Sequence, residues 1–180
     1  MEGELEKWVK TATRSDIQDN FKIVTTITEY YMIKSKFYLN GEEIGLAAIQ
    51  INDYTNQIEQ MNFFPLEYNE ELKYNGIGTL AFTLYLKTLF SLGAKKNYEI
   101  CFGFNKVSSD LFKLLERAGV ETEELETKSF SIEIGKLYEK FKSRSEKMGY
   151  NIMKITKNDI IKEERTKETI ESEKITTYTT

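Results

Sequence analysis

The alternation of apolar and polar residues in the first half of the chain predicts antiparallel strands. Asn40-Gly41 favours a two-residue hairpin turn, because both residues tolerate the positive φ that such a turn requires. A strand over Tyr31–Leu39 should therefore pair with one over Glu43–Ile51. A second turn at Asn52–Asn56 leads into a third strand over Gln57–Phe64. The pattern predicts a three-strand antiparallel meander.

A nearly continuous apolar run from Leu80 to Leu92 predicts a helix packed against a sheet, and Gly93 should end it. The preceding residues Lys73–Thr79, Lys-Tyr-Asn-Gly-Ile-Gly-Thr, predict a glycine-rich turn from a strand into this helix. Such a turn offers unpaired backbone N–H groups at the positive end of a helix dipole, where a phosphate or pyrophosphate can bind. An ordinary tight turn, in which glycine only supplies a positive φ, is the alternative.

The residues after this helix predict a strand followed by a second helix. The strand covers Tyr98–Asn105. Ser108, Ser109 and Asp110 offer an N-cap for the helix, and Gly119 should end it. The order is therefore a candidate phosphate turn, a helix, a strand and a helix.

With this order, the segment resembles the GNAT superfamily of acyl-CoA-dependent N-acyltransferases. The family hallmark is Arg/Gln-x-x-Gly-x-Gly/Ala after a central strand, and Lys73–Gly78 matches it with lysine in the first position. A second family signature has an asparagine at a strand end and Leu-Tyr-x-x-x-Gly-Phe at the close of the next helix. Asn105 and Leu114–Val120 are similar to it. Leu115, however, stands where many members carry a tyrosine that protonates the leaving thiolate, and leucine has no proton to donate.

The resemblance implies an α/β fold with a mixed, twisted sheet flanked by helices on both faces, and acyl-CoA bound where the fourth and fifth strands diverge. It implies transfer of an acetyl group from acetyl-CoA to a primary amine of a small molecule or a protein. Gly76 would let the backbone approach the pyrophosphate, Gly78 would permit the close turn into the helix, and Thr79 would cap the helix and touch phosphate. The implied cofactor-binding residues are Phe63, Lys73, Tyr74, Asn75, Gly76, Ile77, Gly78, Thr79, Asn105 and Ser108.

A general base is harder to assign. Members of the family often use a glutamate on the strand before the glycine turn, and Glu59 is the one acidic residue within Gln57–Phe64. Facing inward beside Met61 and Phe63, Glu59 would be desolvated and would hold a proton more tightly, as a useful base does. Facing solvent, it would be an ordinary surface carboxylate. The candidate substitutes for the missing tyrosine acid are Tyr68, Tyr74 and Tyr98.

Two other functions stay open. A non-catalytic relative could keep the fold and act through protein contacts, which Leu115 and the charged C-terminus favour. An unrelated α+β interaction protein could carry the Gly-x-Gly by chance. The loop Leu66–Leu72 is an apparent insertion relative to the family pattern.

Composition narrows the possible chemistry. The 180 residues include no histidine, which excludes Ser-His-Asp and Cys-His machinery and removes the commonest ligand of catalytic transition metals. Cys101 is the one cysteine, so no internal disulfide or multi-cysteine zinc site can form, and we expect no bound metal. A net charge of −4 disfavours nucleic-acid binding as the main activity. No apolar run reaches the length of a membrane span, and we expect a cytoplasmic protein without membrane contact.

The last third of the chain predicts a strand, a helix and a final strand. Lys128–Ile134 alternates as an exposed edge strand would. Lys136–Lys147 is a charged helix with apolar residues on one side, and Gly149 should end it. Tyr150–Ile155 is predicted to be the last strand of the sheet.

The two ends of the chain are less determined. We place the acyltransferase-like domain at residues 1–156 and a charged extension at residues 157–180, helical to about Lys174. This extension is expected to contact a protein partner, another copy of the chain or nothing. Near the N-terminus, Val9–Asp16 faintly resembles the opening strand and first helix cap of the family. A short amphipathic helix using Leu5, Trp8, Val9 and Ala12 is the alternative.

Overall fold

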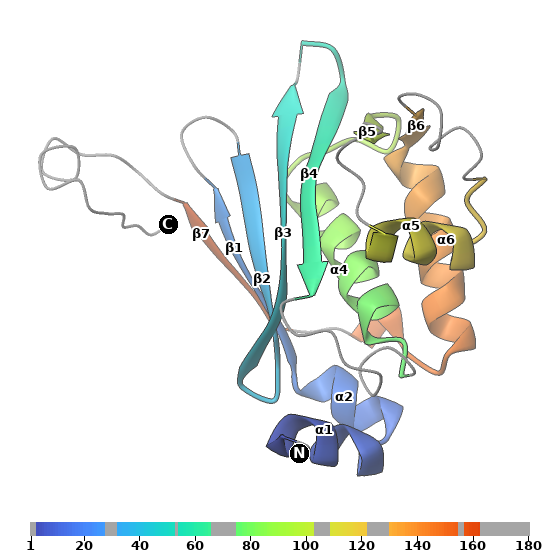
Figure 1. Cartoon of the computed structure of the whole chain (residues 1–180). Helices are drawn as coiled ribbons and strands as arrows, with labels where there is room; N and C mark the ends of the chain where they lie inside the picture. Colours follow the sequence, from blue (N-terminus) through green and yellow to red (C-terminus); the bar gives the residue numbers. More distant parts are fainter. Residues whose placement is uncertain are drawn as a thin grey trace, which may run out of the picture.

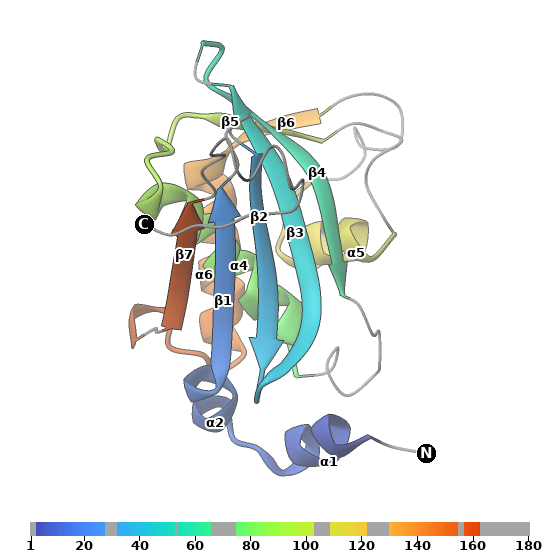
Figure 2. The same ribbon diagram turned by 90° about the vertical axis from the view of Figure 1, so that its left-hand side faces the viewer.

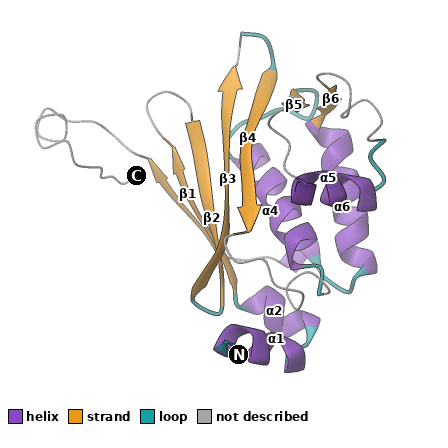
Figure 3. Ribbon diagram, viewed as in Figure 1, coloured by secondary structure: helices purple, strands orange, loops and turns teal. Residues whose placement is uncertain are grey.

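The computed structural model describes residues 3–27, 32–52, 54–65, 75–102, 109–121, 130–154 and 157–162. They form a seven-stranded mixed sheet with helices, in the strand order β6-β5-β4-β3-β2-β1-β7 (Figures 1 and 3). The elements are α1 (Glu4–Thr11), α2 (Arg14–Asp19), β1 (Phe21–Ile27), β2 (Met32–Leu39), β3 (Glu42–Asn52), β4 (Gln57–Pro65), α4 (Ile77–Ser91), β5 (Glu99–Phe102), α5 (Ser109–Arg117), β6 (Phe130–Glu133), α6 (Ile134–Lys147), the 3-10 turn η3 (Ile152–Lys154) and β7 (Lys157–Lys162). The expected mixed α/β fold is confirmed.

The predicted antiparallel meander is also confirmed. β3 pairs with β2 on one side and with β4 on the other, both antiparallel. The turn between β2 and β3 is formed by Asn40 and Gly41, whose φ angles are 52° and 84°. Two successive residues with positive φ give the twist that joins neighbouring strands in a tight hairpin. The two-residue signal in the sequence therefore fixes this part of the sheet.

The N-terminal segment is helical, which decides between the two alternatives. α1 is amphipathic and buries Leu5 and Val9. The opening strand predicted near Val9 is wrong, because the first strand is β1, which begins at Phe21. β1 pairs antiparallel with β2, from Phe21↔Leu39 to Ile27↔Ile33. This strand was not predicted from the sequence.

The last strand also lies further along the chain than predicted. Ile152–Lys154 forms a single 3-10 turn, so the strand predicted over Tyr150–Ile155 is wrong. The strand is β7, Lys157–Lys162, which pairs in parallel with β1. The helical extension predicted from residue 157 is therefore wrong over Lys157–Lys162. Pairing with β1 satisfies the backbone N–H and C=O groups of this stretch better than a marginal helix would. Residues 163–180 lie outside the described residues.

The core lies between the sheet and the two helices α4 and α6, which cover one of its faces (Figure 2). The rings of Phe82 in α4 and Phe141 in α6 have centroids 4.6 Å apart. Tyr85 of α4 meets Phe37 of β2 edge to face, with centroids 6.1 Å apart. On the opposite face of β2, Lys34 is exposed. Over this part of the sheet, the described helices therefore cover one face, whereas helices on both faces were predicted.

The helix ends and the sheet edge follow the sequence pattern. Gly93, Gly119 and Gly149 have φ of 105°, 88° and 99° and follow α4, α5 and α6, as predicted. β6 lies at the edge of the sheet and pairs antiparallel with β5, which confirms the predicted edge strand. Across the described ranges, no helix combines the length and the apolar character needed to cross a membrane.

Candidate functional site

β4 and β5 run in parallel and separate part-way along β4. Their pairing runs from Gln57↔Glu99 to Glu59↔Cys101. The rest of β4 continues to pair with β3 on its other side, as far as Pro65. Among the described residues, this part of β4 has no strand partner on the β5 side. Within the described ranges, the pairing of β4 and β5 therefore ends at Glu59 and Cys101.

A β-bulge in β4 follows the last of these pairs. Ile49 of β3 pairs with Gln60 and Ala48 pairs with Asn62, so Met61 is the extra residue on β4. A bulge bends its strand and increases the local twist. The bend comes two residues after the last described pair between β4 and β5. The backbone of Phe63 lies beyond it, in the part of β4 that pairs with β3.

The glycine turn leads into α4 at the end of the sheet where β4 also ends (Figure 1). Gly76 is the N-cap residue and is left-handed, with φ 70° and ψ 22°. The first hydrogen bond of the helix runs from Leu80 N–H to Gly76 O, at 3.0 Å. The N–H groups of Ile77, Gly78 and Thr79 precede that bond, so the helix has no carbonyl for them. The first turn contains no acidic residue that would compete with a bound anion.

The space beside each glycine is filled by a side chain from another element. A β-carbon on Gly76 would stand 2.5 Å from the sulfur of Met148, just after α6. A β-carbon on Gly78 would stand 3.4 Å from Leu114 of α5. The left-handed backbone favours glycine at position 76, whereas the contact at position 78 is an ordinary one, and an anion at this turn would be bound by the N–H groups.

Asn75, just before the turn, is held by two side chains that are distant in sequence. Its side-chain oxygen accepts a hydrogen bond from Nη1 of Arg14 at 2.5 Å. Its carbonyl oxygen accepts one from the hydroxyl of Tyr150, also at 2.5 Å. Neither partner was predicted from the sequence, because no motif or spacing links Arg14 or Tyr150 to the turn.

The remaining predicted cofactor residues have separate outcomes. The side chains of Ile77 and Thr79 are buried, which leaves their N–H groups as the parts that can meet a ligand. Thr79 as a helix cap is wrong, because the left-handed Gly76 moves the N-cap three residues earlier and no side chain caps it. The predicted residues that lie outside the described ranges are Lys73, Tyr74, Asn105 and Ser108.

The sequence matches no protein-family model and no curated protein. Two solved structures are similar to part of the fold. An IAA acetyltransferase from Bacillus cereus is 21% identical with a TM-score of 0.36, over 49% of this chain and 55% of that one. An acetyltransferase from Bacillus subtilis in complex with CoA is 18% identical with a TM-score of 0.36, over 48% of this chain and 53% of that one. The chain thus spans about half the length of each of these proteins.

The described residues include Leu115, at the position of the family's tyrosine, and Tyr98, one of the three candidate substitutes for it. Leu115 of α5 is fully buried in the core, so this position presents no side chain to a ligand. Tyr98 is buried and precedes β5 at the end where that strand pairs with β4. Tyr98 lies three residues before Cys101, the last β5 residue that pairs with β4. Three residues span roughly 10 Å along an extended chain. Tyr68 and Tyr74 lie outside the described residues.

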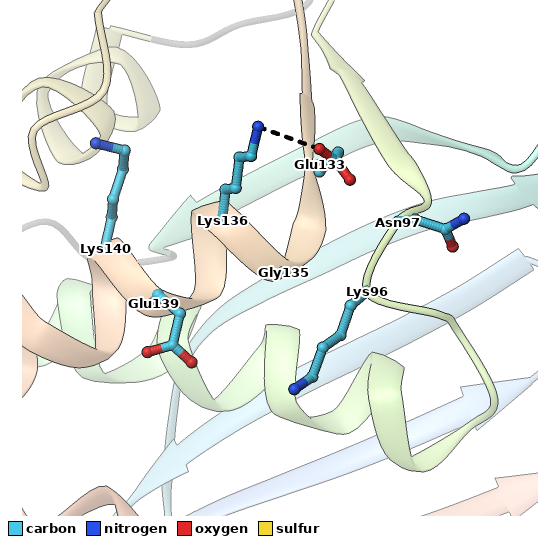
Figure 4. Close-up of a pocket in the computed structure, with 7 residues that line it drawn as sticks. All are labelled: Lys96, Asn97, Glu133, Gly135, Lys136, Glu139 and Lys140. Atoms are coloured by element: carbon cyan, nitrogen blue, oxygen red, sulfur yellow. Dashed lines mark ion pairs between the residues drawn. The ribbon is translucent and has the colours of Figure 1, made fainter.

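A shallow hollow of about 520 Å³ lies elsewhere, between the start of α6 and the loop that follows α4 (Figure 4). Its lining carries both signs of charge, and Lys136 forms an ion pair with Glu133 at 3.2 Å. The hollow is at the C-terminal end of α4, whose 15 residues separate it from Gly76 by roughly 20 Å. The residues that line it are Lys96, Asn97, Glu133, Gly135, Lys136, Glu139 and Lys140. It is separate from the glycine turn.

Proposed function

We propose that the chain is an acyltransferase that binds acyl-CoA at the glycine turn and transfers an acetyl group from acetyl-CoA to a primary amine of a small molecule or a protein. One observation carries the proposal. α4 begins, through the left-handed Gly76, at the end of the sheet where β4 also ends (Figure 1), and the pairing of β4 with its parallel neighbour β5 stops at Glu59, six residues before that end. Ligands of open α/β sheets bind in this kind of crevice, outside the carboxyl ends of the strands.

The chemistry of coenzyme A fits both parts of this site. Its pyrophosphate carries negative charge, which the N–H groups of Ile77, Gly78 and Thr79 and the helix dipole would stabilise. Its pantetheine arm is an extended chain with amide groups. Beyond Glu59, where no described residue pairs with β4 on the β5 side, the β4 backbone would offer such a chain N–H and C=O groups.

The proposed reaction needs orientation more than a reactive side chain. The amine nitrogen attacks the thioester carbonyl carbon, a C–N bond forms and the C–S bond breaks. Coenzyme A leaves as the thiolate and takes up a proton, while the attacking nitrogen loses one. Because the amine is the nucleophile, the missing histidine is no obstacle. Glu59 is the proposed base, on the position of its backbone at the end of the described pairing with β5.

Thermal melting with acetyl-CoA tests the binding part of the proposal. A ligand at about 100 times its dissociation constant stabilises the folded state by roughly 2.7 kcal/mol. We expect a clear rise in melting temperature at millimolar acetyl-CoA, and its absence would overturn the proposal. Release of free thiol from acetyl-CoA with a panel of primary amines then tests catalysis.

A second candidate function is a non-catalytic relative that binds the cofactor and acts through protein contacts. The observation that favours it is the full burial of Leu115, at the position where the resemblance would place a tyrosine acid. A general acid typically contributes about 10² to 10⁴ to a rate. Acetyl-CoA binding without thiol release for any amine would favour this second function.

A further inference from the structure

We propose that Arg14 is a positioning residue for the glycine turn and acts on it through Asn75 and Met148. The inference rests on the proposed function, in that this turn is taken as the coenzyme A site. Arg14 is the first residue of α2 and stands 61 positions before Asn75 in the chain. Figure 1 shows α2 beside the start of α4, where the turn lies.

The guanidinium of Arg14 joins three residues from two other parts of the chain. Its Nη1 donates to the side-chain oxygen of Asn75 at 2.5 Å, and its Nε donates to the carbonyl oxygen of Met148 at 2.8 Å. Its central carbon lies 5.5 Å from the ring centroid of Tyr150, within range of a cation–π interaction. Hydrogen bonds from a charged donor are stronger than neutral ones. Arg14 therefore fastens the turn to the segment that follows α6.

These contacts fix both sides of Gly76. Asn75 precedes Gly76 directly, and the side chain of Met148 fills the space where a side chain of Gly76 would stand. The hydroxyl of Tyr150 donates to the carbonyl oxygen of Asn75, so both oxygen atoms of Asn75 accept hydrogen bonds from distant side chains. The left-handed residue is thus enclosed by groups that Arg14 contacts.

Arg14 is itself held in place. The hydroxyl of Thr13 accepts from Asp16 N–H and the carboxylate of Asp16 accepts from Thr13 N–H, both at 3.0 Å, which forms a capping box around the start of α2. A β-carbon on Gly149 would stand 3.0 Å from Cγ of Arg14, so glycine at that position leaves room for the arginine stem. The Arg14 side chain is therefore held at its backbone end as well as at its guanidinium.

The consequence concerns the direction of the amide groups. No side chain caps α4, so the orientation of its first N–H groups depends on the conformation of the turn. Without Arg14 the turn loses the hydrogen bonds from the guanidinium to Asn75 and Met148 and keeps the one from the Tyr150 hydroxyl to Asn75. Anion binding should then weaken. The rate of acyl transfer at saturating acetyl-CoA should not change, because the contacts of Arg14 are to the turn and not to reacting atoms.

The test compares Arg14→Gln with Gln18→Leu as a matched control. Gln18 is also on α2, and its side-chain oxygen accepts from Asn151 N–H at 2.7 Å, so its loss also loosens α2 from the segment after α6. Both variants should lower the melting temperature. Only Arg14→Gln should raise the dissociation constant for coenzyme A, at least tenfold, and speed hydrogen exchange at the Leu80 amide, which closes the first turn of α4.

Arg14→Lys keeps the charge but cannot reach both acceptors in the same way, so its dissociation constant should lie between those of the wild type and Arg14→Gln. Equal weakening of coenzyme A binding in the Gln18→Leu control would overturn the inference, as would unchanged exchange at Leu80 in Arg14→Gln. If the wild type binds no coenzyme A, the proposed function fails. The exchange at Leu80 then decides the role of Arg14 without any ligand.

Discussion

Met148 occupies the place that a side chain on Gly76 would need. The sulfur of Met148 is 2.5 Å from an ideal β-carbon on Gly76, and the terminal methyl group is in contact with the same point. Gly76 also has a left-handed backbone, with φ of 70°. The left-handed backbone therefore favours glycine here without any ligand, and the end of the Met148 side chain would have to shift to admit a β-carbon.

Gly76→Ala should therefore destabilise the fold. The left-handed backbone costs a non-glycine residue about 1–2 kcal/mol, whereas the flexible end of the Met148 side chain can shift away from a β-carbon at low cost. We expect urea unfolding to show a loss of about 1–2 kcal/mol. In a Met148→Ala background the same substitution should cost the same amount. A clearly smaller loss in that background would show that Met148 cannot move aside.

Gly78 should tolerate a methyl group but not a branched side chain. A β-carbon there meets Leu114 at 3.4 Å, an ordinary contact, and alanine is preferred over glycine in a helix by about 1 kcal/mol. Gly78→Ala should keep the wild-type melting temperature or raise it, and should keep any rise that acetyl-CoA causes. Gly78→Val should overpack against α5 and lose that rise. If Gly78→Ala alone abolishes acetyl-CoA binding, the ligand approaches this α-carbon directly.

The sequence predicts those parts of the fold whose signals are local. Asn40-Gly41 fixes the β2–β3 hairpin because two residues with positive φ determine its twist, and Gly93 ends α4 for a similar reason. The glycine turn before α4 is predicted by the same kind of local evidence. Such features depend on a few neighbouring residues, so the sequence pattern is sufficient.

Other parts depend on pairings between distant residues and were missed or misplaced. β7 is a strand because its residues pair with β1, and no pattern within Lys157–Lys162 predicts that pairing. Tyr150 looks like the start of a strand but is buried where its hydroxyl reaches Asn75. Arg14 contacts Asn75 across 61 positions. A single sequence contains no signal for such a contact, which is why the support of the candidate site was missed.

The Tyr150 hydroxyl should make stability depend on pH in the alkaline range. Burial raises the pKa of Tyr150 from 10.0 to about 12, and the nearby Arg14 lowers it by a smaller amount. Below pH 10 the hydroxyl is protonated in both the folded and the unfolded chain, so its full contribution to stability is present. Between pH 10 and 12 the unfolded chain ionises first, and the free energy of unfolding should fall by up to roughly 3 kcal/mol, at about 1.36 kcal/mol per pKa unit.

Tyr150→Phe isolates this contribution. The variant keeps the ring beneath Arg14 and loses the hydrogen bond to Asn75. Its stability should be lower than that of the wild type at pH 8, and the difference should shrink as the pH rises from 10 to 12. Chemical denaturation at several pH values measures both curves. A difference that stays constant over this range would mean that Tyr150 has an ordinary pKa.

The pairing of β7 with β1, rather than the domain boundary predicted at residue 156, should determine how much of the C-terminus can be removed without loss of stability. β7 pairs with β1 along six residues, from Lys22↔Lys157 to Ile27↔Lys162. A chain that ends after Thr156 loses these hydrogen bonds, each of which contributes about 0.5–1.5 kcal/mol, and leaves β1 as an unpaired edge. A chain that ends after Lys162 keeps them.

We expect the chain ending after Lys162 to melt within about 2 °C of the full chain, since 1 kcal/mol corresponds to roughly 2–4 °C at this size. The chain ending after Thr156 should melt at least about 5 °C lower, because several kcal/mol of pairing are lost. Both should still respond to acetyl-CoA if they fold, since β7 and the glycine turn are at different parts of the sheet. Equal melting temperatures for the two truncated chains would show that β7 adds nothing to the stability of the sheet, and the domain would then end where the sequence first placed it.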